Sequence, residues 1–152
     1  MNIDGKTRLL GLLGDPVEHT MSPVIHNTLS DVLGFNEVYV PFHTTSEGLK
    51  NAVKGAYDLN ILGMNATVPH KNAVIDMLVD IDAGAKAIGA VNTLVRVEGG
   101  YKGYNTDMMG LSRELDVYGI SLKERNAVIL GAGGAARAVA YMCAAKGCKK
   151  EI

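Results

Sequence analysis

The sequence predicts an α/β fold with a mostly parallel sheet and helices on both faces of that sheet. Short apolar or β-branched segments alternate along the chain with longer segments of helical pattern. Such alternation is typical of βαβ units, whose strands run parallel. Hydrophobic residues make up 47% of the 152 residues, which favours a packed core and argues against disorder.

Local signals delimit each predicted element. Ser22 as N-cap, Pro23 at the first helical position and Gly34 after the last turn define one helix. Thr45 or Ser46 caps the next. In chain order we expect a strand at 8–14, a helix at 22–33, a strand at 37–42, a helix at 46–57, a strand at 61–66, short helices at 71–79 and 82–88, a hairpin of 93–97 with 101–105, and a helix at 107–118.

A charged connector at 121–125 marks a domain boundary, so we expect a first domain at 1–120 and the beginning of a second at 121–152. The second begins with a buried strand, Ala127 to Leu130, and continues into an Ala-rich helix at 133–146 that ends at Gly147.

A glycine-rich turn, G-x-G-x-x-A, joins that strand to that helix. Glycines permit the tight turn and the approach of a pyrophosphate, and the helix N-terminus favours its negative charge. We therefore expect a dinucleotide site formed by Gly131, Ala132, Gly133, Gly134 and Ala135.

Polar side chains cluster after two other predicted strands. Asn65, Thr67 and Lys71 follow one, and Thr106 and Asp107 follow another. Small ligands usually bind at the carboxyl ends of strands in α/β folds. A lysine and an aspartate held there can move a proton, which predicts an enzyme.

Composition excludes several classes of partner. The net charge of -1 gives no reason to expect a nucleic acid or a membrane surface. No signal peptide and no apolar run of membrane-spanning length are visible. Cys143 and Cys148 fit no metal motif, so we expect reduced thiols in a cytoplasmic protein that binds no metal.

Five motifs together resemble the N-terminal half of the shikimate dehydrogenase family. They occur in the family's order and span nearly the whole chain. They are Gly14-Asp15-Pro16 with Thr20-Met21-Ser22-Pro23 and His26-Asn27; Asn65 to Lys71; Gly89-Ala90-Val91-Asn92-Thr93; Gly103 to Asp107 with Gly110; and Gly131 to Ala138.

This resemblance implies an NADP-dependent oxidoreductase that interconverts 3-dehydroshikimate and shikimate in aromatic amino-acid biosynthesis. It implies a substrate-binding domain followed by the first β-α unit of a Rossmann-type NADP domain. Lys71 and Asp107 match the catalytic pair. Thr20 and Ser22 match the hydroxyls that hold the substrate carboxylate. The remaining matches contact ring hydroxyls or line the pocket: Asn65, Thr67, Asn92 and Thr106.

Several alternatives remain open at this stage. Burial favours a neutral lysine whereas a nearby carboxylate favours a charged one, so either Lys71 or Asp107 is the proton acceptor. Thr20 stands where the family usually has Ser, and its extra methyl group narrows the carboxylate site. This difference leaves quinate or an amino-shikimate open as the substrate. The residue that selects NADP over NAD lies about 20 positions beyond the glycine motif, past Ile152. Besides a shikimate dehydrogenase and a related dehydrogenase with another substrate, the third hypothesis is a substrate-binding module without redox activity.

The ending of the chain adds two expectations. A central parallel strand needs neighbours on both edges, and the sequence stops where a second Rossmann strand begins, after Gly147. We expect the 152-residue chain to be inactive by itself and to associate, as a homodimer or through its C-terminal unit. The four histidines are expected to have supporting or local structural roles.

Overall fold

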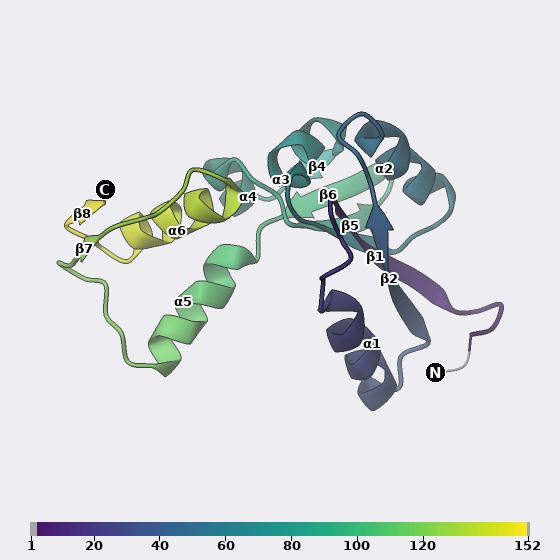
Figure 1. The fold of residues 1–152 in the computed structure, drawn as a ribbon, viewed down its shortest axis with the longest axis horizontal. Coiled ribbons are helices and arrows are strands. Elements are labelled where there is room, and N and C mark those ends of the chain that lie inside the picture. Colours follow the sequence, from purple (N-terminus) through teal and green to yellow (C-terminus); the bar gives the residue numbers. More distant parts are fainter. Residues whose placement is uncertain (1–2, 152) are drawn as a thin grey trace.

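A six-stranded sheet forms the main body of the protein, with a smaller, mostly helical part beside it (Figure 1). The computed structural model describes residues 3–151, so Ile152, part of the expected second Rossmann strand, lies outside the described residues. The strand order is β2-β1-β3-β5-β6-β4. The strands are β1 (Arg8–Gly14), β2 (Glu37–His43), β3 (Gly63–Ala66), β4 (Asp80–Ile81), β5 (Thr93–Val97) and β6 (Gly100–Tyr104).

The sheet is mixed but mostly parallel, as the sequence predicts. β1 runs parallel to β2 and β3, and β4 runs parallel to β6. β5 is antiparallel to both of its neighbours, β3 and β6. The pairing with β6 is a hairpin, in which a tight turn with Gly99 at a φ of 81° folds β6 back on β5. The predicted hairpin is therefore confirmed.

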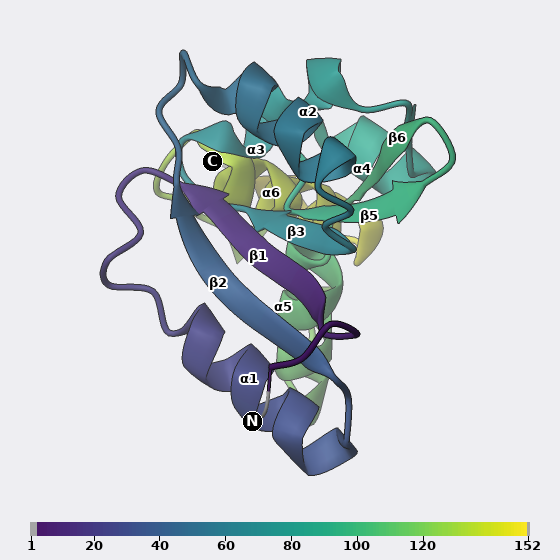
Figure 2. The same ribbon diagram turned by 90° about the vertical axis from the view of Figure 1, so that its right-hand side faces the viewer.

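Helices lie on both sides of the sheet (Figure 2). They are α1 (Ser22–Leu33), α2 (Leu49–Asp58), α3 (His70–Ala73), α4 (Ala83–Ile88), α5 (Asp107–Val117) and α6 (Gly134–Ala145), with a 3-10 turn at Val74–Met77. The largest core lies under α2, where Leu49 and Val53 pack with Leu13, Leu94 and Tyr101. No helix in residues 3–151 is long and apolar enough to cross a membrane.

Two helix starts differ from the predicted ones. Ser22 is the first residue of α1 rather than its cap, and its backbone N–H donates to Thr20 Oγ1 at 3.2 Å. The second helix begins at Leu49, because Thr45 Oγ1 accepts a hydrogen bond from Gly48 N and so caps the preceding turn. Local side-chain acceptors decide where each helix begins.

The helix predicted at 71–79 is also wrong in its second half. After α3 and the 3-10 turn, Leu78 becomes extended and β4 pairs with β6. The side chains of Leu78 and Val79 lie where side chains on Gly103 and Gly100 would otherwise stand. Those two glycines let the segment lie along the edge of β6.

The predicted buried strand from Ala127 to Leu130 is wrong. Strand β7 covers only Asn126–Ala127 and pairs in parallel with β8 (Lys150–Glu151). Val128 is 70% exposed and Leu130 is 94% exposed. No described strand pairs with either residue, so neither has a sheet to be buried in. The βαβ unit itself forms as predicted, and a 2.6 Å ion pair from Lys146 to Asp116 ties α6 to α5.

Candidate functional site

Three strand ends meet at one edge of the sheet and bring the predicted polar residues together. Asn65 near the end of β3 pairs with Thr93 at the start of β5, and Thr93 pairs with Tyr104 at the end of β6. Because β5 runs antiparallel, its beginning lies beside the carboxyl ends of its neighbours. The segments that follow β3 and β6 therefore converge, as ligand-binding loops do in α/β folds.

Lys71 and Asp107 form a close ion pair at this edge. Lys71 Nζ lies 2.6 Å from Asp107 Oδ2, although the two residues are far apart in the sequence. Their side chains are 17% and 31% exposed. The partial burial restricts water while leaving both groups accessible from one side.

Asp107 does not cap the helix that it begins. The carboxylate oxygens accept from Lys71 and from Asn92 Nδ2 at 2.7 Å, whereas the backbone N–H of Asp107 donates to Asn105 Oδ1. Asn105 thus accepts the backbone hydrogen bond at the start of α5, and the carboxylate of Asp107 is left to pair with Lys71.

Asn92 is the centre of the hydrogen-bond network, and its side chain is buried. Its Nδ2 donates to Thr106 Oγ1 and Asp107 Oδ1, and its Oδ1 accepts from Thr93 and from the backbone N–H of Thr106. Because the Asn92 amide makes all these hydrogen bonds at once, it has one favoured orientation, and this orientation fixes the position of the Asp107 carboxylate.

A second group of residues extends the site towards α1. The amide of Asn65 donates to Asn92 O, and Asn65 Oδ1 accepts from the Tyr39 hydroxyl at 2.8 Å. Thr20 Oγ1 donates to Ser22 Oγ at 3.1 Å, so the two predicted carboxylate ligands are adjacent. Within the described residues, no hydrogen bond or ion pair joins the Thr20–Ser22 pair directly to Lys71.

Tyr39 is a site residue that the sequence analysis missed. Burial raises the pKa of the Tyr39 hydroxyl to about 12, and the contact with the Ser22 hydroxyl offsets part of that rise. The phenol also stacks on His26, with ring centroids 4.2 Å apart. Its position in β2 resembles that of any core tyrosine, and only the folded chain places it between Ser22 and Asn65.

A hollow of about 330 Å³ separates the segment at Thr67 and Lys71 from the glycine-rich turn. Its walls also include Gly133, Gly134 and Ala135, so the two predicted sites share one cavity. A side chain on Gly14 would collide with the Thr67 methyl group, which is 2.5 Å from the place of its Cβ. Glycine at that position lets the end of β1 approach the site.

The glycine-rich turn fits a dinucleotide. Gly131 has a φ of 123°, which other residues rarely adopt, and nothing lies within 4 Å of a side chain built on Gly133. Within residues 3–151, no side chain caps the N-terminus of α6. The N–H groups of its first turn are therefore available to phosphate oxygens. Among the described residues, no group of His, Cys, Asp and Glu is arranged to hold a metal.

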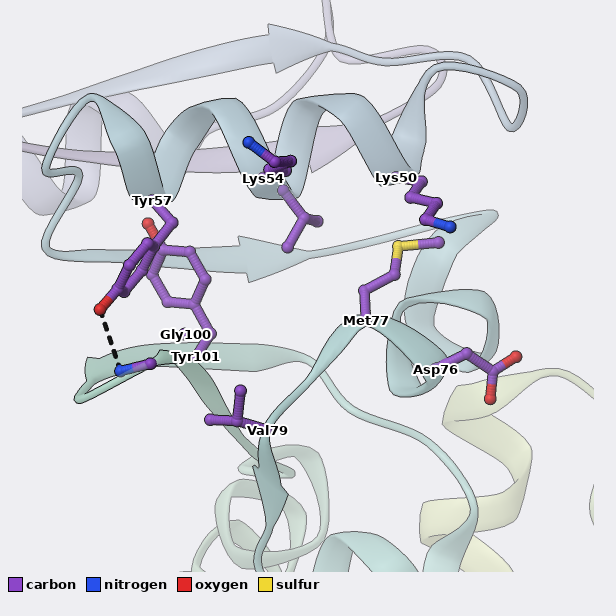
Figure 3. A pocket seen from close by; sticks show the side chains of 10 residues that line it. Lys50, Lys54, Tyr57, Asp76, Met77, Val79, Gly100 and Tyr101 are labelled. Atoms are coloured by element: carbon purple, nitrogen blue, oxygen red, sulfur yellow. Dashed lines mark hydrogen bonds between the residues drawn. The ribbon is translucent and has the colours of Figure 1, made fainter.

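A different groove of about 320 Å³ lies between α2 and the β5–β6 hairpin (Figure 3). Its lining includes the apolar side chains of Val53, Met77 and Tyr101, and Lys50 and Lys54 extend from α2. None of the predicted site residues lines this groove.

His70 joins the lysine segment to the end of β2. It is completely buried, and its Nε2 donates to the backbone oxygen of Thr44 at 2.6 Å. Its Nδ1 has no partner among the described residues. The contact supports the expected structural role of this histidine.

Comparisons with known proteins identify the family. The family model of the shikimate dehydrogenase substrate binding domain matches residues 12–94. The chain belongs to the shikimate dehydrogenase family. It is 45% identical over 148 residues to the NADP(+) shikimate dehydrogenase of Gloeothece citriformis, covering 97% of this chain and 51% of that protein. It is 50% identical over 140 residues to the one of Methanococcus maripaludis, with coverages of 91% and 50%. The chain thus spans about half the length of these relatives.

Solved structures give the same result. Shikimate dehydrogenase of Aquifex aeolicus superposes with a TM-score of 0.94 at 42% identity, covering 98% of this chain and 56% of that one. The enzyme of Thermus thermophilus in complex with NADP(H) and shikimate has a TM-score of 0.87 at 37% identity, with coverages of 95% and 54%. A 5-ketofructose reductase of Gluconobacter has a TM-score of 0.86 at 35% identity, with coverages of 97% and 53%. The fold therefore occurs with more than one named activity.

The raised pKa of Tyr39 makes a prediction about alkaline stability. The folded state holds the phenol proton up to about pH 12, whereas an unfolded tyrosine loses it near pH 10. Between these values the unfolded state binds fewer protons, so this contribution to stability is complete below pH 10 and is lost as pH rises towards 12. Urea unfolding measured from pH 9 to 12 should show a shallower fall in stability for Tyr39→Phe than for the unchanged chain.

Tyr118→Phe is the matched control, since it removes a phenol that is 72% exposed. An equally steep fall in the Tyr39→Phe variant would contradict the assignment.

Proposed function

We propose that this protein is the substrate-binding part of an NADP-dependent shikimate dehydrogenase, with the start of its cofactor domain. The observation that carries the proposal is the 2.6 Å pair of Lys71 and Asp107 beside the glycine-rich turn. Proton handling next to a dinucleotide site is what oxidation of a secondary alcohol requires. The names and bound ligands of the relatives support the same reaction.

Different residues of the site would bind different groups of shikimate. The adjacent hydroxyls of Thr20 and Ser22 would hold the carboxylate. The amides of Asn65 and Asn92 and the hydroxyls of Thr67 and Thr106 would meet the ring hydroxyls. Several precisely placed polar groups reject analogues that lack a hydroxyl, because the protein groups are then left unpaired.

Lys71 and Asp107 would act as a unit in the reaction. As the C–H hydride leaves the alcohol carbon, the O–H proton passes to this pair and a carbonyl forms. Bound NADP+ would supply the hydride acceptor. Asn92 keeps one Asp107 oxygen engaged, so the carboxylate stays oriented while the proton moves.

We also propose a division at residue 120, with the substrate domain at 1–120 and the cofactor domain starting at 121. The connector at 121–125 and the separate β7–α6–β8 unit support it. The location that we propose is the cytoplasm, as expected from the cysteine pattern of the sequence.

Two other activities remain candidates. Thr20 in place of the family's usual serine and the likeness to a 5-ketofructose reductase favour a related polyol or keto substrate such as quinate. A binding module without redox chemistry is disfavoured, because binding alone gives no reason for a shared cavity between Lys71 and the glycine-rich turn.

Calorimetric titration of shikimate into the chain tests the proposal. Saturable binding is expected, and Thr67→Val should weaken it by about tenfold or more, since valine keeps the packing against Gly14 and removes one hydroxyl. Lys50→Ala, in the groove of Figure 3, is the control and should bind normally. A folded chain that binds neither shikimate nor quinate would disprove the proposal.

Thr20→Ser tests the source of specificity. Removing the methyl widens the carboxylate site, so the ratio of shikimate to quinate affinity should rise by roughly tenfold or less, the usual value of one methyl group in a pocket. Paired titrations with the two acids measure it. An unchanged ratio would show that Thr20 does not select the substrate.

We further propose that the chain associates through its C-terminal unit, as the exposure of Val128 and Leu130 favours. Light scattering should give a mass above 16.1 kDa that rises with concentration, and Leu130→Glu should lower it. A constant monomer mass would contradict the association.

A further inference from the structure

The first turn of α6 lies close to the side chain of Lys71, across the edge of the hollow that both line. A Cβ built on Gly134 would lie 3.1 Å from Lys71 Cβ, 3.2 Å from Lys71 Cδ and 3.3 Å from Asn72 Oδ1. Ordinary van der Waals contact between carbon atoms begins at about 3.5 Å. A side chain at this position would therefore require Lys71, Asn72 or the helix to shift by a few tenths of an ångström.

A second set of contacts holds α6 in this place. Arg137 Nη1 donates to Gly89 O at 3.3 Å, and Ala138 is buried with Ile88 and Ala90. The lysine segment is also tied to this region, because Val91 N donates to Lys71 O at 2.8 Å. These contacts hold α6 at two points, so a larger residue at position 134 would not readily push the helix away from Lys71.

The backbone at Gly134 gives no other reason for a glycine. It is the first residue of an α-helix, and it does not belong to the glycines with positive φ. Alanine is a better helix former than glycine. The closeness of Lys71 and Asn72 is thus the feature of this position that disfavours a side chain.

We propose that Gly134 is a positioning residue for the Lys71–Asp107 pair, a role whose chemical meaning rests on the proposed function. Asn92 holds the Asp107 carboxylate, so a methyl group at position 134 would move the lysine rather than the aspartate. The glycine-rich turn therefore has two tasks. It offers N–H groups to a phosphate on one side, and it supports the proton-handling lysine on the other.

Amine labelling of Lys71 tests the proposal without any ligand. In the unchanged chain the ammonium group is paired and its side chain is 17% exposed, so Lys71 should react slowly compared with the exposed Lys50. Gly134→Ala should raise the relative labelling rate of Lys71, quantified by mass spectrometry from pH 7 to 10. We expect roughly a threefold to tenfold increase, the range for weakening one charged hydrogen bond.

Two variants calibrate this measurement. Gly133→Ala is the matched control and should leave the rate unchanged, because nothing lies within 4 Å of its Cβ position. Asp107→Asn removes the partner and should raise the rate. If Asp107→Asn raises it while a folded Gly134→Ala does not, the positioning role is wrong.

Relief of the collision provides a further test. Asn72→Ala removes one of the three atoms that the new methyl group meets, so the double variant should recover part of the slow labelling. No recovery would contradict the role of the contact. If Gly134→Ala by itself does not fold, the double variant is compared with Asn72→Ala and should still label faster. Because no ligand is present, failure of shikimate to bind would leave this result intact.

Discussion

The buried amide of Asn92 holds the centre of the site together, and Thr93, Thr106 and Asp107 are all hydrogen-bonded to it. It uses both its donor and its acceptor, reaching Thr93 at the start of β5 and Thr106 and Asp107 beyond β6. A buried amide that lost such partners would be costly, so the three strand ends are constrained to one arrangement. The antiparallel β5 makes this possible, since it brings the start of one strand beside the ends of two others.

Close approach of the backbone provides the second constraint. Gly14 makes room for Thr67, and Gly134 makes room for Lys71. Both glycines have ordinary φ values, so their importance comes from packing between segments rather than from a turn. Gly131 differs, because its positive φ is required by the turn itself. The same residue type therefore serves two physical purposes within one site.

The two parts of the chain are stabilised differently. The sheet packs a continuous core under α2, with Leu13, Leu94 and Tyr101 almost fully buried. The β7–α6–β8 unit has a small core around Ala138 and leaves Val128 and Leu130 exposed. It packs against α4 and against α5, the helix that begins with Asp107. Packing of this unit and the geometry of the candidate site are therefore linked.

The sequence by itself determined the alternation of strands and helices, the hairpin and the glycine-rich turn, and it predicted most of the residues that the structure brings together at the candidate site. These follow from local signals such as the Gly99 turn and from motifs whose order is specific. Only the tertiary structure decided the rest. The extended path of Leu78 and Val79 depends on glycines of another strand, and burial at 127–130 depends on strands that must lie alongside. Tyr39 and Gly134 gain their roles from neighbours far away in the chain, Asn65 and Lys71. Local patterns report a residue's own conformational preference, whereas contacts between distant segments arise only when the sheet brings them together.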